Sequence, residues 1–198
     1  MLTVVGAGPG NPRYLTEDAL ERIRRADVVM AFGRIADSLG QIRNDIVRIR
    51  SVSSEEIILH SQGDAVLLAS GDPCFHGIVG YLRKNGIEVH DIVPGISSMQ
   101  YMFSRLGLEW QEAHMTSAHG RELQLEELIK NRLSVVLLDS ETSPTHVSMM
   151  IFEHGARGTI HAGMNLSYDD ERVVSVRIGE EVNLNSNLTM VVIENENA

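Results

Sequence analysis

The chain has 198 residues, an apolar share of 43% and a charged share of 22%, which is the composition of a soluble globular protein with one large domain or two small ones. Its formal net charge of −10 argues against general binding to nucleic acids or to anionic membranes. Cys74 is the single cysteine, which excludes an intrachain disulfide and a thiolate metal site. With no stretch apolar enough for a membrane span and no signal or transit pattern at the start, we expect a cytoplasmic protein.

The first part of the chain predicts an α/β domain over residues 1–110, because short apolar runs alternate with amphipathic segments. The expected strands cover residues 2–5, 27–31, 46–49, 66–69 and 87–93, and the expected helices cover residues 16–26, 34–42, 53–60, 77–84 and 99–106. Thr16 is a good N-cap, and Glu17 and Asp18 suit the positive end of the first helix. This alternation favours a mostly parallel sheet with helices on both faces.

The second part predicts another α/β domain over residues 113–198, after a hinge at residues 107–112. The expected strands cover residues 135–138, 158–164, 172–178 and 188–193, and helices are expected near residues 125–129 and 144–154. The last stretch is therefore rich in strands, and no internal repeat accompanies it.

Polar, glycine-containing turns follow three of the expected strands in the first domain. The central one is Ser70-Gly71-Asp72-Pro73, which ends the buried run at residues 66–69; the others are the loop at residues 6–16 and the turn at residues 94–98. In an open α/β sheet, ligands bind in the crevice beyond the carboxyl ends of the strands. Each turn alone is compatible with a plain connection, whereas the three together favour a ligand site.

A dinucleotide-binding fold is one interpretation of the first loop, because Gly6 and Gly8 follow the first strand. The fingerprint requires a third glycine where this chain has Asn11, and an acidic residue at the end of the second strand, where none occurs. A dinucleotide-binding oxidoreductase therefore stays as the alternative from a different class.

The set of turns resembles the tetrapyrrole methylase family, whose members use S-adenosylmethionine to methylate corrin and sirohaem precursors. The opening loop at residues 6–16 and Ser117-Ala-His-Gly-Arg121 are most similar to stand-alone members of the CbiE type. That resemblance implies methylation of carbon 5 of cobalt-precorrin-7 or precorrin-6Y type intermediates. The alternatives within the same fold are methylation of another tetrapyrrole carbon or of a diphthamide precursor.

The resemblance also implies two α/β domains, with a mostly parallel sheet in the first, a mixed sheet in the second and the cofactor in the cleft between them. It implies that these residues bind the cofactor: Ser70, Gly71, Asp72, Phe75, Ser97, Ser98, Leu138, Asp139 and Leu166. It implies that Pro9, Arg13, His119 and Arg121 bind the substrate, with Arg34 as a further candidate.

The remaining expectations concern partners and catalysis. A homodimer is implied by the resemblance, and docking of a separate carbon-15 methyltransferase or decarboxylase subunit stays open. The eight histidines show no zinc-ligand spacing, so we expect no protein-bound metal, and any cobalt would arrive within the substrate. No general base is identified from the sequence.

Overall fold

The computed structural model describes residues 1–50, 54–61, 63–118, 120, 123–184 and 189–198. They form two compact units, Met1–Tyr101 and Met102–Ala198. The domain division expected from the sequence, 1–110 and 113–198, stays a prediction.

The first unit contains a five-stranded parallel sheet in the order β3-β2-β4-β1-β5. Its strands are β1 (Leu2–Gly6), β2 (Val28–Phe32), β3 (Val47–Ile49), β4 (Ala65–Ala69) and β5 (Asp91–Val93). Its helical segments are η1 (Pro12–Tyr14), α1 (Glu17–Arg25), α2 (Gly33–Ser38), α3 (Ser54–His60), α4 (Val79–Lys84) and the start of α5 (Ser98–Leu106). All five residues of β4 are buried, as expected for a central strand covered on both faces.

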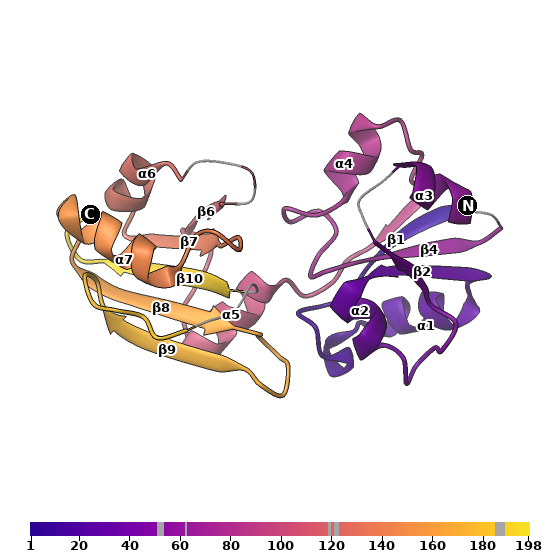
Figure 1. The fold of residues 1–198 in the computed structure, drawn as a ribbon, viewed down its shortest axis with the longest axis horizontal. Helices are drawn as coiled ribbons and strands as arrows, with labels where there is room; N and C mark the ends of the chain where they lie inside the picture. Colours follow the sequence, from indigo (N-terminus) through magenta and orange to yellow (C-terminus); the bar gives the residue numbers. More distant parts are fainter. Residues whose placement is uncertain (51–53, 62, 119, 121–122, 185–188) are drawn as a thin grey trace. The chain divides into compact units, whose positions relative to one another are not determined.

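Helices cover both faces of this sheet, which confirms the expected α/β class (Figure 1). On one face, α1 and α2 pack through residues such as Ile23 and Ala36. On the other face, α3 and α4 pack through Ile57 and Leu82. Thr16 caps α1 by accepting a hydrogen bond from the Ala19 N–H at 3.1 Å, as its sequence position predicts.

The expected strand over residues 87–93 is shorter than predicted, because only Asp91–Val93 are strand residues. β5 pairs with β1 from Thr3 to Val5, and the His90 N–H still reaches the Leu2 carbonyl at 2.9 Å. Because β1 begins at Leu2, it has no residue that could pair with residues 87–89. Ile87 instead donates its N–H to the Leu82 carbonyl at 2.9 Å and ends the turn after α4.

The second unit contains a five-stranded mixed sheet in the order β6-β7-β10-β8-β9, which confirms the expected mixed sheet. Its strands are β6 (His114–Ser117), β7 (Leu133–Leu137), β8 (Gly158–Met164), β9 (Arg172–Arg177) and β10 (Thr189–Asn195). β6 and β7 are parallel, and the other pairs are antiparallel. The helices α6 (Leu125–Lys130) and α7 (Pro144–Glu153) cover one face and bury Leu128 and Ile151 against it.

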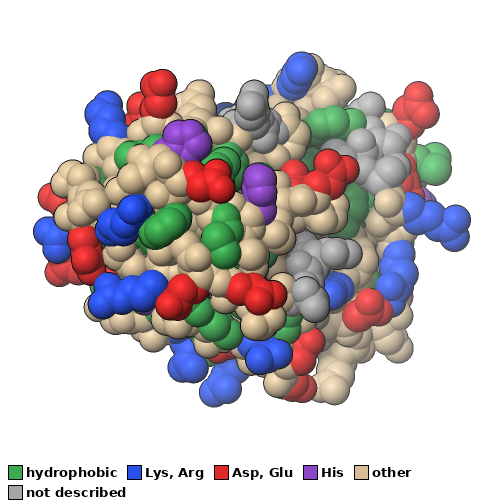
Figure 2. Space-filling model, turned by 60° about the vertical axis from the view of Figure 1, so that its left-hand side comes forward, with side chains coloured by type: hydrophobic (Ala, Val, Ile, Leu, Met, Phe, Trp, Pro, Cys, Tyr) green, Lys and Arg blue, Asp and Glu red, His purple; other side chains and the backbone are tan. Residues whose placement is uncertain are grey.

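The surface shown in Figure 2 carries acidic and basic side chains interspersed with one another, and neither sign dominates that face. A nucleic-acid interface requires a continuous basic patch, and this view shows none. Among the described residues, no helix combines the length and the apolar character that crossing a bilayer requires.

Candidate active site

The connections of the first sheet define where a ligand is expected to bind. The chain leaves β1 toward β2 through α1 on one face, and it leaves β4 toward β5 through α4 on the opposite face. Because β1 and β4 are neighbours, their carboxyl ends form a topological switch point, where open α/β sheets bind ligands. The loop after β1 and the turn after β4, both selected from the sequence, therefore lie together.

Hydrogen bonds join these two connections directly. Gly71 donates its N–H to the Gly8 carbonyl at 2.8 Å, and Gly8 donates its N–H to the Gly71 carbonyl at 3.3 Å. The Ala7 N–H reaches the Ala69 carbonyl at 2.8 Å. The pairing of β1 and β4 is thus extended beyond the sheet into the predicted ligand-binding edge.

The turn after β5 packs against the same point. A Cβ atom on Gly95 would lie 2.3 Å from the Gly71 carbonyl oxygen and 2.9 Å from the Gly6 carbonyl carbon. A Cβ atom on Gly6 would lie 2.5 Å from the Gly95 nitrogen. Three backbone segments therefore meet at a separation that only glycine allows.

Asp72 fixes this arrangement through its carboxylate. Its Oδ1 accepts a hydrogen bond from the Cys74 N–H at 2.8 Å, which closes the turn after β4. Its Oδ2 accepts a hydrogen bond from the Gly95 N–H at 3.2 Å, which links that turn to the one after β5. Both oxygens thus bind backbone groups of the protein, and Asp72 holds two of the predicted cofactor-binding turns together.

The other predicted residues of the turn after β4 lie close to Asp72 in the sequence. Ser70 is exposed and Phe75 is half-buried. The Phe75 ring meets the His76 ring edge to face, with 4.9 Å between centroids. His76 has a φ of +49°, a conformation that is uncommon outside glycine and that clusters at functional sites.

The start of α5 is closed by a reciprocal cap that sequence reasoning missed. The Ser97 N–H donates to Gln100 Oε1 at 2.9 Å, and the Gln100 N–H donates to Ser97 Oγ at 3.1 Å. The Ser-x-x-Gln spacing is the signature of such a capping box, so this signal was present in the sequence. Ser97 is buried and its hydroxyl serves the helix, whereas Ser98 is half-buried.

The predicted cofactor residues of the second unit follow its strands. Leu138 lies directly after β7, and its side chain is part of the buried core. Asp139 Oδ1 accepts hydrogen bonds from the N–H groups of Glu141 at 3.1 Å and Thr142 at 2.8 Å. Asp139 therefore stabilises the turn after β7, as Asp72 stabilises the turn after β4.

Leu166 lies in a tight turn after β8. Its neighbours Asn165 and Ser167 have φ angles of +48° and +72°, although neither is glycine. The Ser167 N–H donates to Glu171 Oε2 at 2.6 Å, and Asn165 Nδ2 donates to Asp170 Oδ2 at 2.7 Å. Such buried, over-determined backbone geometry is typical of ligand sites.

The predicted substrate residues fall into two groups. Pro9 is buried, and Arg13 and Arg34 are exposed on the segments that follow β1 and β2. His119 and Arg121 lie outside the described residues. Among the residues that are described, no group of three His, Cys, Asp or Glu side chains has the arrangement of a metal site.

Comparisons with known proteins agree with these features. A family model described as Tetrapyrrole (Corrin/Porphyrin) Methylases matches residues 1–181. The cobalt-precorrin-7 C(5)-methyltransferase of Salmonella typhimurium is 34% identical, and the alignment covers 99% of this chain and 100% of that enzyme.

Two solved structures share the fold across nearly the whole chain. The precorrin-6Y methylase of Archaeoglobus fulgidus has a TM-score of 0.78 at 27% identity, with 99% of this chain and 98% of that one covered. The uroporphyrin-III C-methyltransferase of Thermus thermophilus, complexed with S-adenosylhomocysteine, also has a TM-score of 0.78, at 22% identity and 96% coverage of both chains.

Proposed function

The chain belongs to the tetrapyrrole methylase family and is a methyltransferase, and we propose that it methylates carbon 5 of a cobalt-precorrin-7 type intermediate in cobalamin biosynthesis. The observation that carries the proposal is the end-to-end match to an enzyme of that activity, at 34% identity. Because this alignment covers 99% of this chain and 100% of that enzyme, it supports the same reaction rather than a shared cofactor domain alone.

We propose S-adenosylmethionine as the methyl donor, bound at the switch point between β1 and β4. When bound, it supplies a methyl group on a sulfonium that is already strongly electrophilic, so the protein needs no nucleophilic side chain. The residues present fit it: the exposed Ser70 hydroxyl and the half-buried Phe75 ring flank the turn. Asp72 is bound to backbone N–H groups on both oxygens, which fixes the turn in advance of binding.

The proposed work of the protein is positioning. Two large reactants must be held in line, and a rigid framework lowers the entropic part of the barrier. The shared backbone contact at Gly6, Gly71 and Gly95 supplies such a framework. Leu138, Asp139 and Leu166 of the second unit are proposed as cofactor-binding residues on the family resemblance alone.

The proposed substrate carries several carboxylates, which guanidinium groups bind in pairs of hydrogen bonds. We assign this role to Arg13, with His119 and Arg121 as further contributors and Pro9 in the same loop as Arg13. We further propose that the enzyme is cytoplasmic, since a single cysteine suits a reducing compartment. We also propose that it forms a homodimer, as the family resemblance implies.

The test begins with isothermal titration of the purified protein with S-adenosylhomocysteine and, in parallel, with NADH. We expect micromolar or tighter binding of the former, about −8 kcal/mol, and no heat with NADH. Cobalt-precorrin-7 and methyl-labelled S-adenosylmethionine are then supplied together, and the product is analysed by mass spectrometry and carbon NMR. The expected product carries one additional labelled methyl group, located on carbon 5.

The other outcomes point to the alternatives. A labelled methyl group on another carbon would reassign the chain to a different step of tetrapyrrole methylation. Binding of S-adenosylhomocysteine without any tetrapyrrole methylation would direct attention to a substrate such as the diphthamide precursor. NADH binding without S-adenosylhomocysteine binding would overturn the cofactor proposal.

A further inference from the structure

Arg13 is held in place at the backbone level by its own segment. Asn11 Oδ1 accepts a hydrogen bond from the Arg13 N–H at 3.1 Å, and Pro12 occupies the first position of η1. The Tyr14 N–H reaches the Asn11 carbonyl at 3.0 Å. The short helix is therefore closed at its start, and the direction in which the Arg13 side chain leaves the backbone is fixed.

One tyrosine ring lies beside the guanidinium, and a second tyrosine ring packs against the first. Arg13 Cζ lies 5.8 Å from the centroid of the Tyr14 ring, within the range of a cation–π interaction. The Tyr14 ring meets the Tyr101 ring edge to face, with centroids 5.1 Å apart and planes at 77°. Tyr101 lies in the first turn of α5, whose start is fixed by the cap between Ser97 and Gln100.

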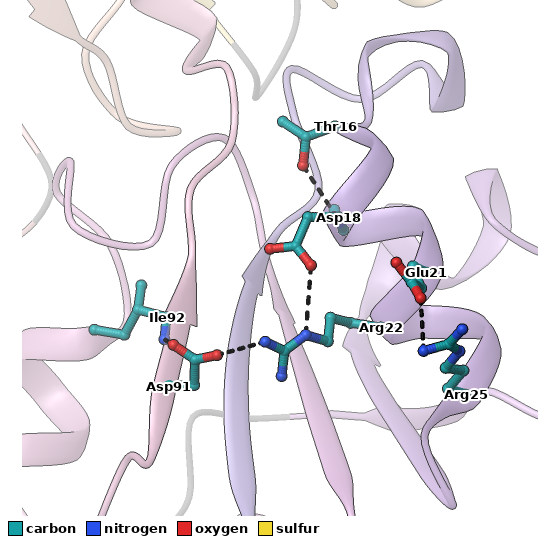
Figure 3. A network of polar contacts seen from close by, with 8 residues as sticks. Thr16, Asp18, Glu21, Arg22, Arg25, Asp91 and Ile92 are labelled. Atoms are coloured by element: carbon teal, nitrogen blue, oxygen red, sulfur yellow. Dashed lines mark hydrogen bonds and ion pairs between the residues drawn. The ribbon is translucent and has the colours of Figure 1, made fainter.

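The charge of Arg13 is not neutralised within the described part of the chain. Arg13 is exposed, and none of the described carboxylates lies within ion-pair distance of it. Arg22 on the neighbouring helix gives the contrast, because it contacts Asp18 at 3.4 Å and Asp91 at 2.7 Å (Figure 3). Arg13 is thus an exposed cation beside an aromatic ring, and its charge is available to a carboxylate of a ligand.

Its position agrees with a role in ligand binding. η1 follows β1, and α5 follows β5, and these two strands are neighbours in the parallel sheet. Arg13 and Tyr101 therefore both lie in connections that leave the carboxyl edge, where the cofactor is proposed to bind.

We propose that Arg13 binds a peripheral carboxylate of the tetrapyrrole, and that Tyr14 and Tyr101 are positioning residues that act through Arg13. The inference rests on the proposed function, because it requires a polycarboxylated substrate. A guanidinium oriented before binding loses less freedom when the carboxylate arrives, so the two rings increase affinity without contacting the substrate.

The test uses the full chain saturated with S-adenosylhomocysteine and uroporphyrin III as a polycarboxylated fluorescent probe. We expect Arg13→Gln to weaken binding of the probe about tenfold to a hundredfold, and Tyr101→Leu to weaken it about twofold to fivefold. Tyr101→Phe keeps the ring and should bind as the unaltered chain does. Arg24→Gln, which removes an exposed arginine on α1, is the matched control and should have no effect.

The decisive measurement is the double variant Arg13→Gln/Tyr101→Leu. If Tyr101 acts through Arg13, the double variant binds the probe no more weakly than Arg13→Gln alone. Additive losses would overturn the positioning role, and unchanged binding by Arg13→Gln would overturn the proposal as a whole. Affinity for S-adenosylhomocysteine should be the same in every variant.

A second readout separates this inference from the proposed function. The Nε–Hε signal of Arg13, assigned by its loss in Arg13→Gln, should report an ordered side chain that becomes mobile in Tyr101→Leu. A mobile signal in the unaltered chain would overturn the positioning role. An ordered signal in a chain that does not bind uroporphyrin III would instead overturn the tetrapyrrole assignment and support the role of the two rings.

Discussion

Asp72 Oδ2 accepts a hydrogen bond from the backbone N–H of Gly95 at 3.2 Å, and this contact joins the turn after β4 to the turn after β5. The other carboxylate oxygen accepts from the Cys74 N–H at 2.8 Å. A single side chain therefore determines the relative position of two segments that are predicted to touch the cofactor. The effect of Asp72 on cofactor binding is then expected to be large and to come from the turns it holds.

Replacement of Asp72 tests this expectation. Asp72→Ala leaves the N–H groups of Cys74 and Gly95 without their acceptor, and hydrogen bonds to charged groups contribute about 1.5–3 kcal/mol each. We expect the affinity for S-adenosylhomocysteine to fall roughly tenfold to a hundredfold. Asp72→Asn keeps one acceptor oxygen, so its affinity for S-adenosylhomocysteine should lie between those of the unaltered chain and Asp72→Ala. Titration calorimetry measures all three proteins, and an unchanged affinity in Asp72→Ala would remove this turn from the site.

The glycine contact makes a separate prediction about stability. Gly95→Ala places a methyl group 2.3 Å from the Gly71 carbonyl oxygen, and relief of such overlap costs about 1–3 kcal/mol of unfolding free energy. Gly80 on α4 is the matched control, since a Cβ atom there meets nothing within 4 Å.

Gly80→Ala should raise the free energy of unfolding by about 0.5–1 kcal/mol, because alanine is the better helix former. Urea denaturation of both variants gives the comparison. A loss of stability in Gly80→Ala equal to that in Gly95→Ala would show that the close backbone approach has no special cost.

The sequence predicted most of the fold because its signals are local. Short apolar runs mark buried strands such as β4, and the glycine and proline turns mark their ends. One exception is β5, whose start depends on where β1 begins to offer partners at Thr3. The start of β5 is therefore set by the start of β1, so no pattern within residues 87–93 predicts it.

The candidate site was predicted less completely, for the same reason. The turn at Asp72 was found from its own residues, whereas the contact of Gly6 with Gly95 joins distant parts of the chain. The Ser97 cap has a local signal in the sequence, namely the Ser-x-x-Gln spacing from Ser97 to Gln100. The ring contact of Tyr14 with Tyr101 had none.

Arg43 makes another contact that local patterns do not predict. Its Nη1 donates to the carbonyls of Ile23 at 2.9 Å and Ala26 at 2.6 Å, at the end of α1, and its Nε donates to Asp45 at 2.6 Å. Lysine cannot make these contacts together. We expect Arg43→Lys to lower the free energy of unfolding by about 1–3 kcal/mol.

Arg25→Lys is the control for Arg43→Lys. The Arg25 side chain is 77% exposed and pairs only with Glu21 among the described residues (Figure 3), so its replacement should change stability by less than about 0.5 kcal/mol. Thermal or urea unfolding of the two variants measures the difference. Equal effects would mean that the carbonyl contacts of Arg43 do not stabilise α1.

The ion pair of Arg43 and Asp45 also predicts how stability depends on pH. The hydrogen bond and charge of Arg43 hold the pKa of Asp45 below its usual range. The unfolded chain therefore binds a proton at Asp45 before the folded chain does, so this contribution to stability is complete above the ordinary aspartate pKa of about 3.9. It is lost as the pH falls below about 4, through the lower pKa of the folded state.

Asp45→Asn should consequently be less stable than the unaltered chain by a constant amount between about pH 5 and pH 7, and this difference should shrink below about pH 4. Asp169→Asn, at an exposed aspartate, is the matched control. Urea unfolding across this range measures both. A difference for Asp45→Asn that grows as the pH falls would have the wrong sign for a carboxylate with a depressed pKa, and it would overturn the stabilising pair of Arg43 and Asp45.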